Sequence, residues 1–191
     1  EEKTELLAGM MWHKITRTAE KLGIRSEVTS YVPYDAGKLE VMMVTIENIG
    51  TEEYVVTPIA AVPLYARSAD NIRDHRHVTS LLHRIRVREE GVFVTPTLTF
   101  DERGHQENKM TYGAGYAQDG SMPKQFYPTV EMFLGEGGTY LAPEAVYWQT
   151  EGRKPQEEAA GYPDELCGCE AMGAFAFERC TLGAGEKRTY V

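Results

Sequence analysis

The chain has 191 residues and a formal net charge of -9, with 42% hydrophobic and 26% charged residues. This is ordinary globular composition, and the length suits one well-cored domain better than two. The acidic balance disfavours nucleic-acid binding, and without an apolar run of about 18 residues no transmembrane helix is expected.

The N-terminus, EEKTELLAG, has neither the basic region nor the apolar run of a signal peptide. We therefore expect a cytoplasmic protein that does not bind membranes.

The first segments in chain order read as strands. Residues 4–23 fit either a helix or a strand, and we favour a strand because the segments that follow are β-like. Residues 24–35 alternate apolar and polar side chains, which is typical of a strand. Residues 39–50 are nearly continuously apolar, which predicts a strand covered on both faces.

Residues 54–66 predict one long, irregular strand, because Pro58 and Pro63 interrupt it. Further strands are predicted at 92–100, 110–117 and 171–182. Residues 183–191 read as a turn and the start of another strand, which suggests that the chain is a fragment of a larger protein.

One short helix is predicted near residues 128–134. Pro128 suits its start, Val130 and Phe133 have helical spacing, and Gly135 suits its end. The polar residues 151–165 predict a surface loop. The pattern as a whole predicts an all-β fold, a large two-sheet antiparallel β-sandwich forming a single domain over residues 1–191.

The densest polar stretch is SADNIRDHRHVTSLLHRIRVREEG, residues 68–91, which holds three of the five histidines. In an extended backbone His75 and His77 would point to one face, so a metal site with Asp70 or Asp74 is one interpretation. The many guanidinium groups nearby argue against it, because cations repel one another.

A second interpretation is recognition of an anion or a sugar, because planar guanidinium groups fit carboxylate, phosphate or vicinal hydroxyls. A third is structural: the arginines pair with some of the 29 acidic residues and fix a long loop between two strands. The candidates for carbohydrate or interdomain contact are Arg67, Asp70, Arg73, Asp74, His75, Arg76, His77, His83 and Arg84.

Two other groups are weaker candidates. Asp101 and Glu102 are too close in sequence to lie on opposite sides of a glycosidic bond, so DERG predicts a turn with internal ion pairs. Aromatic side chains would suit stacking on sugars if exposed, although most belong to the core. In a strand, the adjacent side chains of Tyr147 and Trp148 would point to opposite faces, so we expect one of these two rings to be partly exposed. The full aromatic set is Tyr65, Phe126, Tyr127, Phe133, Tyr140, Tyr147 and Trp148.

The three cysteines, Cys167, Cys169 and Cys180, do not make a disulfide framework. Their C-x-C spacing differs from that of zinc ribbons, so neither a metal nor another cofactor is expected.

Several segments resemble the N-terminal β-sandwich domain of inverting glycoside phosphorylases of glycosyltransferase family 36, later glycoside hydrolase family 94. Among them are ITRTAEKLGIRSEVTSYVPYD, LEVMMVTIENIG, TPIAAVPLYARSADNIRDHRHVTSLLHRI and GVFVTPTLTFDERGH. The landmark FLGEGGTYLAPEAV, residues 133–146, is similar to the short-helix region of these sandwiches. The resemblance runs from about residue 4 to the end and is nearest to the 1,2-β-oligoglucan phosphorylases.

This resemblance implies a galactose-mutarotase-like supersandwich that precedes an (α/α)6 barrel. In the family, a barrel Asp is the general acid, and inorganic phosphate attacks a β-glucoside to give α-glucose 1-phosphate. The fragment would then be inactive alone, without catalytic residues or cofactors, although its parent would be a phosphorylase.

The family's sandwich also implies a homodimer and contact with the barrel domain of the same chain. The stretch 67–84 is our candidate for a loop that closes part of the cleft over gluco-oligosaccharide and phosphate. A free-standing carbohydrate-binding module is the alternative, and a small metal-dependent enzyme using His75, His77 and Asp74 is a third possibility.

Overall fold

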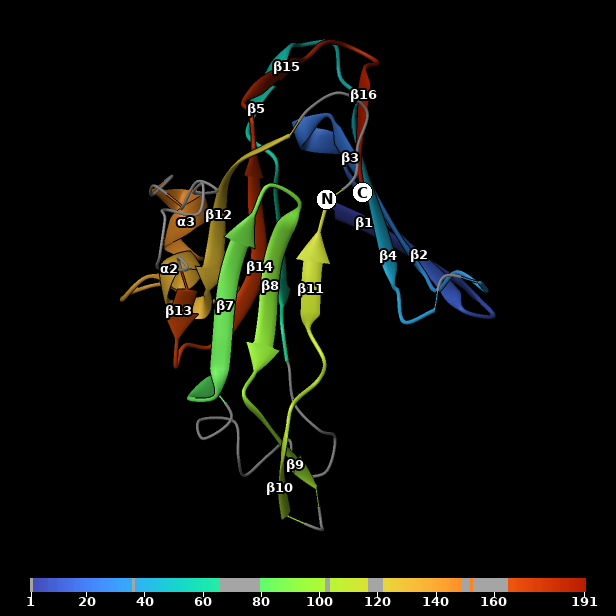
Figure 1. Ribbon diagram of the computed structural model, residues 1–191. Helices are drawn as coiled ribbons and strands as arrows, with labels where there is room; N and C mark the ends of the chain where they lie inside the picture. Colours follow the sequence, from blue (N-terminus) through green and yellow to red (C-terminus); the bar gives the residue numbers. More distant parts are fainter. Residues whose placement is uncertain are drawn as a thin grey trace. The chain divides into compact units, whose positions relative to one another are not determined.

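A computed structural model describes residues 2–35, 37–65, 80–101, 104–116, 122–148, 152 and 165–191. Strands dominate these residues, all of the strand pairs found among them are antiparallel, and the helices are short (Figure 1). The all-β prediction is confirmed.

The chain forms two compact units. The first comprises Glu1–Thr57, Tyr116–Met122 and Glu178–Val191, and the second comprises Pro58–Gly115 and Pro123–Phe177. The single domain over residues 1–191 stays a prediction.

The first unit contains a five-stranded sheet in the order β1-β2-β3-β4-β16. Its strands are β1 (Glu2–Gly9), β2 (Trp12–Ala19), β3 (Ile24–Tyr31), β4 (Val41–Asn48) and β16 (Lys187–Tyr190). The 3-10 helix η1 (Glu20–Leu22) links β2 to β3, and β5 (Tyr54–Val56) pairs with β15 (Cys180–Leu182). The ambiguous residues 4–23 thus form a hairpin, which confirms the preference for strand.

The period of two along each strand separates an apolar from a polar face of this sheet. One cross-strand row joins Leu6, Ile15, Val28, Val44 and Tyr190. The prediction that residues 39–50 are covered on both faces is wrong, because β4 is only partly buried except at Asn48. Every second residue of β4 lies on the polar face of the five-stranded sheet. A nearly continuous apolar sequence therefore did not require that both faces of the strand be buried.

The second unit contains two sheets. One has the order β11-β8-β7-β13, formed by β11 (Tyr112–Gly115), β8 (Gly91–Pro96), β7 (His83–Arg88) and β13 (Glu165–Cys167). The other has the order β12-β14-β6, formed by β12 (Pro123–Thr129), β14 (Ala171–Phe177) and β6 (Ile59–Pro63). Strand β14 contacts β8 and β11, and β12 contacts β7 and β8, so the sheets pack face to face as a sandwich.

Residues 54–66 do not form one long strand as predicted, but two strands in different sheets, β5 and β6. Pro58 lies between these strands, and as a proline it has no backbone N–H to donate to a sheet. Its carbonyl oxygen still accepts a hydrogen bond from the Phe177 N–H, 3.0 Å away.

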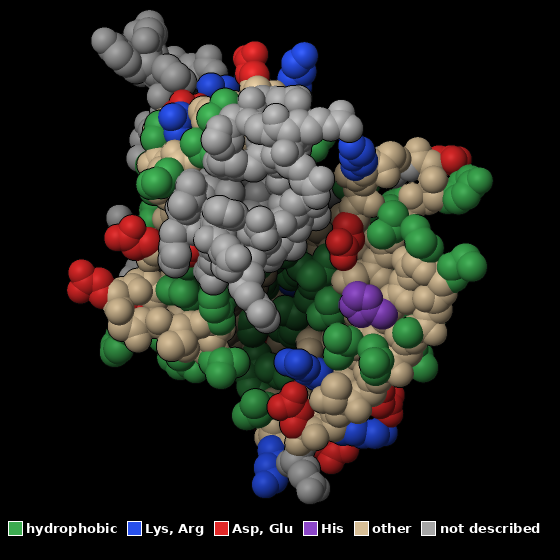
Figure 2. Space-filling view, turned by 90° about the horizontal axis from the view of Figure 1, so that it is seen from below, with side chains coloured by type: hydrophobic (Ala, Val, Ile, Leu, Met, Phe, Trp, Pro, Cys, Tyr) green, Lys and Arg blue, Asp and Glu red, His purple; other side chains and the backbone are tan. Residues whose placement is uncertain are grey.

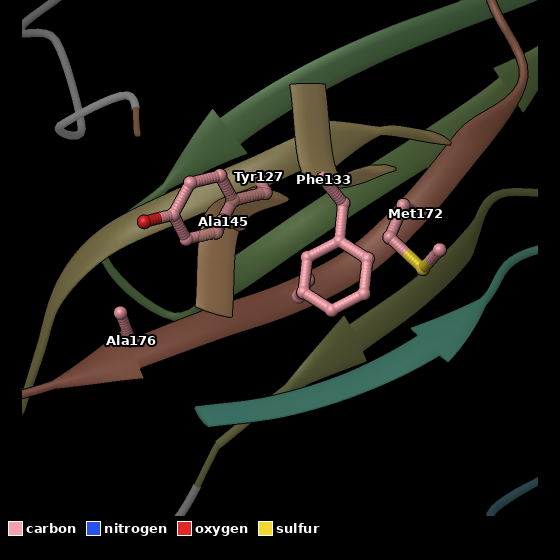
Figure 3. Close-up of a cluster of buried hydrophobic side chains, with 6 residues drawn as sticks. Tyr127, Phe133, Ala145, Met172 and Ala176 are labelled. Atoms are coloured by element: carbon pink, nitrogen blue, oxygen red, sulfur yellow. The ribbon is translucent and has the colours of Figure 1, made fainter. Parts of the chain in front are cut away.

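Strand β14 is the strand that is buried throughout its length. Tyr127, Met172, Ala174 and Ala176 form one core cluster with residues of the helices α2 (Val130–Leu134) and α3 (Glu144–Tyr147), namely Phe133 and Ala145 (Figure 3). Gly173 and Phe175 alternate with them and therefore face the four-stranded sheet. Helices cover one face of β14 and the four-stranded sheet covers the other. Apart from Met172, β14 consists of small and aromatic residues only.

Candidate functional site

The structure describes only the last part of the polar stretch, from residue 80 onward. Its candidates Arg67, Asp70, Arg73, Asp74, His75, Arg76 and His77 lie outside the described residues. His83 and Arg84 are described, and both belong to the start of β7.

Both residues form hydrogen bonds at the start of β7. The His83 side chain is 5% exposed, and its Nδ1 lies 3.1 Å from the carbonyl oxygen of Cys169, a hydrogen-bond distance. The Arg84 guanidinium donates to the carbonyl oxygen of His83 over 2.9 Å. Further along the strand, Arg86 pairs with Glu165 on the neighbouring β13 at 3.0 Å. Arg86 thus forms an ion pair of the kind that the structural interpretation expects, whereas Arg84 bonds to backbone carbonyl oxygens.

A polar groove on the five-stranded sheet is the second candidate, and none of the sequence predictions included it. The groove measures about 300 Å³ and is lined by Thr16, Arg25, Glu27, Thr45, Glu47 and Lys187. They come from β2, β3, β4 and β16, whose register aligns them in two cross-strand rows. The available signal was the run of alternating Thr, Glu and Arg side chains in residues 14–18 and 25–29.

Glu47 is the central charge of the polar groove. Its side chain is 14% exposed and receives hydrogen bonds from the Arg25 guanidinium, whose Nε lies 2.7 Å away. The Lys187 ammonium lies 3.2 Å from the other carboxylate oxygen. Burial alone would raise the pKa of Glu47, but the hydrogen bonds and charges of Arg25 and Lys187 outweigh it and lower that pKa below 4.5.

The chemistry of the polar groove follows from these contacts. Glu47 is ionised at neutral pH, so it accepts hydrogen bonds and does not serve there as a general acid. Beside it, the Thr45 and Thr189 hydroxyls lie 2.8 Å apart, and Lys14 pairs with Glu27 at 2.9 Å. The polar groove thus presents hydroxyl and charged groups, most of which form hydrogen bonds or ion pairs with one another.

The landmark FLGEGGTYLAPEAV contains the end of α2, a glycine-rich turn and the start of α3. Thr129 caps α2 by accepting a hydrogen bond from the Met132 N–H at 3.2 Å, and the helix ends at Gly135, whose positive φ of 74° favours glycine. Glu144 then accepts a hydrogen bond from the Gly137 N–H at 3.0 Å. The short helix predicted near residues 128–134 is confirmed, and the landmark builds a cover for the sandwich core.

The exposed aromatic side chains are the third candidate. Phe126, Tyr127 and Phe133 are in the core, whereas Tyr147 is 67% and Trp148 77% exposed. The expectation of one exposed ring from this pair is wrong: residues 144–147 form a helix rather than a strand, so the two rings are not forced onto opposite faces. Tyr65 and Tyr140 are also more than half exposed.

The remaining sequence candidates are the DERG segment and the three cysteines. Asp101 pairs with Gly104 where β9 (Leu98–Asp101) and β10 (Gly104–Glu107) run antiparallel, and the other two residues of DERG, Glu102 and Arg103, lie outside the described residues. Cys167, Cys169 and Cys180 are free thiols. Within the described ranges, no three His, Cys, Asp or Glu side chains are grouped closely enough to hold a metal ion.

Two further surface properties are relevant to binding partners. On the face drawn in Figure 2, the acidic and basic side chains are interspersed rather than separated by sign. None of the helices formed by the described residues has the length and apolarity needed to cross a bilayer.

No protein-family model and no curated protein matches this chain.

Proposed function

We propose that this chain is the non-catalytic N-terminal sandwich domain of an inverting glycoside phosphorylase that acts on β-glucans in the cytoplasm. The observation that carries the proposal is the landmark FLGEGGTYLAPEAV, which holds the end of the helix α2, a glycine-rich turn and the start of the helix α3 on an antiparallel sandwich. Both the sequence and the position of this element agree with the resemblance to glycosyltransferase family 36.

In this proposal the chain supports a homodimer and contacts the helical-barrel domain that follows it in the full-length protein. The barrel supplies the general acid and the phosphate site. Gluco-oligosaccharide and inorganic phosphate are therefore ligands of the full-length enzyme, which releases α-glucose 1-phosphate.

The proposal is tested by comparing this chain with the full-length protein encoded by the uninterrupted reading frame. Both are incubated with 1,2-β-linked gluco-oligosaccharides with and without inorganic phosphate, and α-glucose 1-phosphate is measured. We expect phosphate-dependent release from the full-length protein and none from the chain of 191 residues. Release by the chain alone, or a reading frame that encodes no helical barrel, contradicts the proposal.

A free-standing carbohydrate-binding module is the second candidate, favoured by the exposed rings of Tyr147 and Trp148. Aromatic faces of this kind stack on sugar rings. Calorimetry with gluco-oligosaccharides distinguishes the two proposals: a module predicts saturable binding that Trp148→Ala abolishes. Tyr34→Ala is the matched control, because Tyr34 is 99% exposed and lies in the other unit. Absence of binding by the unmodified chain rules this candidate out.

A further inference from the structure

Strand β1 is an edge of the five-stranded sheet and is exposed along its whole length. Among the described residues it pairs with β2 alone, and all eight of its residues are exposed. An edge strand presents backbone N–H and C=O groups that can pair with another strand. Leu6 and Leu7 lie on opposite faces of β1 and are 66% and 60% exposed, so apolar side chains flank this edge on both sides.

The opposite edge of the same sheet has the features that normally prevent such pairing. Strand β16 begins with Lys187 and Arg188, and basic side chains disfavour edge-to-edge association. In β1 the charges are confined to Glu2, Lys3 and Glu5, and the run from Leu6 to Gly9 is uncharged and contains no proline. The β1 edge is therefore better suited than the β16 edge to pairing with another strand.

A second copy of β1 fits this edge. The pairing must be antiparallel about a two-fold axis, because the same strand then serves both copies. An axis at Lys3 or at Glu5 would place like charges opposite one another, which is destabilising. An axis at Thr4 would pair Lys3 with Glu5, but over five residues only and through exposed ion pairs, which contribute little.

An axis at Leu6 gives the longest pairing without opposed like charges. It joins residues 3–9 of both copies, with Leu6 opposite Leu6, Glu5 opposite Leu7 and Thr4 opposite Ala8. An axis at Leu7 leaves only residues 5–9 paired. Burial of the leucine side chains contributes more than an exposed ion pair, so the axis at Leu6 is favoured over the one at Thr4.

The apolar face of the sheet supports the same axis. Leu6 is the outermost residue of the row that runs through Ile15, Val28 and Val44 to Tyr190. Pairing at Leu6 would continue this row directly into the same row of the second copy. The exposed end of one apolar row would then be covered by the exposed end of another.

We infer that two copies of this chain associate through their β1 strands, antiparallel about a two-fold axis at Leu6, to form one continuous ten-stranded sheet from the two five-stranded sheets. The inference rests on the homodimer in the proposed function and names the surface that forms it.

The inference is tested by sedimentation velocity from micromolar to millimolar concentrations. We expect the unmodified chain to form a dimer, and Leu6→Lys to raise its dissociation constant at least about tenfold, because two ammonium groups would face each other across the axis. Leu81→Lys is the matched control, since Leu81 is 63% exposed and lies in the other unit. It should leave the dissociation constant unchanged.

The position of the axis is tested by cross-linking under mild oxidation. Leu6→Cys should add a disulfide-linked dimer, whereas Thr4→Cys should not, because Thr4 lies opposite Ala8 of the second copy rather than opposite itself. The three native cysteines are present in both variants and cancel in the comparison.

The outcomes separate the inference from the proposed function. A dimer that resists Leu6→Lys and is cross-linked no better by Leu6→Cys than by Thr4→Cys overturns the β1 interface and leaves dimerisation standing. A chain that stays monomeric up to millimolar concentration overturns both the interface and the homodimer. Neither result bears on glucose 1-phosphate release by the full-length protein, which tests the enzymatic part separately.

Discussion

The side-chain amide of Asn48 donates a hydrogen bond to the carbonyl oxygen of Leu182, 2.9 Å away and 134 positions along the chain. It also donates to the carbonyl oxygen of Glu52, and its own side-chain oxygen accepts from the Gly50 N–H. Asn48 is fully buried. One side chain thus joins the end of β4, the turn that follows it, and β15.

Replacement of Asn48 by alanine is expected to lower the free energy of unfolding by about 2–4 kcal/mol, because it leaves buried carbonyl groups without their donor. Urea denaturation measures the change. Asn108→Ala is the control: Asn108 bonds to the Met110 carbonyl at an exposed position, and its loss should cost less than about 1 kcal/mol. Equal effects of the two substitutions would contradict the role of Asn48.

The ion pairs of Glu47 should make stability depend on acid pH. The folded-state pKa of Glu47 is lowered from 4.5, so its contribution is fully present above pH 4.5 and is lost as the pH falls through the folded-state pKa. Glu47→Gln should cost about 1 kcal/mol at neutral pH, and the difference from the unmodified chain should shrink as the pH falls through the lowered folded-state pKa of Glu47. Urea midpoints at several pH values measure this, with the exposed Glu89→Gln as control. A difference that is constant with pH would refute it.

Tyr190 should make stability depend on alkaline pH. Burial, with the Cys180 thiol 3.9 Å from the phenol oxygen, raises the pKa of Tyr190 from 10.0 to about 12. The contribution is therefore fully present below pH 10 and is lost as the pH rises towards 12, since the unfolded chain ionises first. Tyr190→Phe should flatten this decline, and Tyr34→Phe, at a position 99% exposed, should not. Identical alkaline profiles for all three proteins would show that Tyr190 does not cause the decline.

Gly173 and Ala114 mark a close approach between the two sheets of the second unit. A Cβ atom at Gly173 would collide with the Cβ of Ala114 on β11. Gly173→Ala should therefore destabilise the protein by about 1–3 kcal/mol, as overpacking does in close-packed cores. Adding Ala114→Gly should recover part of the loss, as thermal denaturation of the double variant would reveal. Additive losses from the two substitutions would contradict a direct contact.

The turn between β1 and β2 contains a strained residue. Met11 has φ 65°, in the left-handed region that disfavours residues with a Cβ atom. Met11→Gly should raise the free energy of unfolding by about 1 kcal/mol, because glycine adopts this conformation without the steric cost. Met10 has no positive φ, so Met10→Gly should give no such gain. Thermal denaturation in dilute solution compares the two, and equal melting temperatures would contradict the strain at Met11.

Several elements were predictable because their causes are local. Alternating side chains predicted β3, and the alternation of small and aromatic residues in 171–182 predicted strand structure where β14 and β15 lie. The short helix α2 followed from Pro128, the spacing of Val130 and Phe133, and Gly135. In each case the signal and the structure occupy the same few residues.

Other features were not predictable because they depend on distant partners. The polar groove is assembled from four strands, and only their register brings Arg25, Glu47 and Lys187 together. Residues 54–66 appeared as one apolar run, yet β5 and β6 pair with different strands. One exposed ring was expected from the adjacent residues Tyr147 and Trp148, but both rings are exposed at the end of the helix α3.

By itself, the sequence determined the strand-rich class, the helix near residues 128–134 and the turns at glycine and proline, because backbone preference and side-chain period act over a few residues. The tertiary structure decided which strands pair, which faces are covered and which polar side chains meet. Burial and ion pairing depend on residues far apart in the chain: β14 is covered on both faces and β4 is not, although both have apolar sequences.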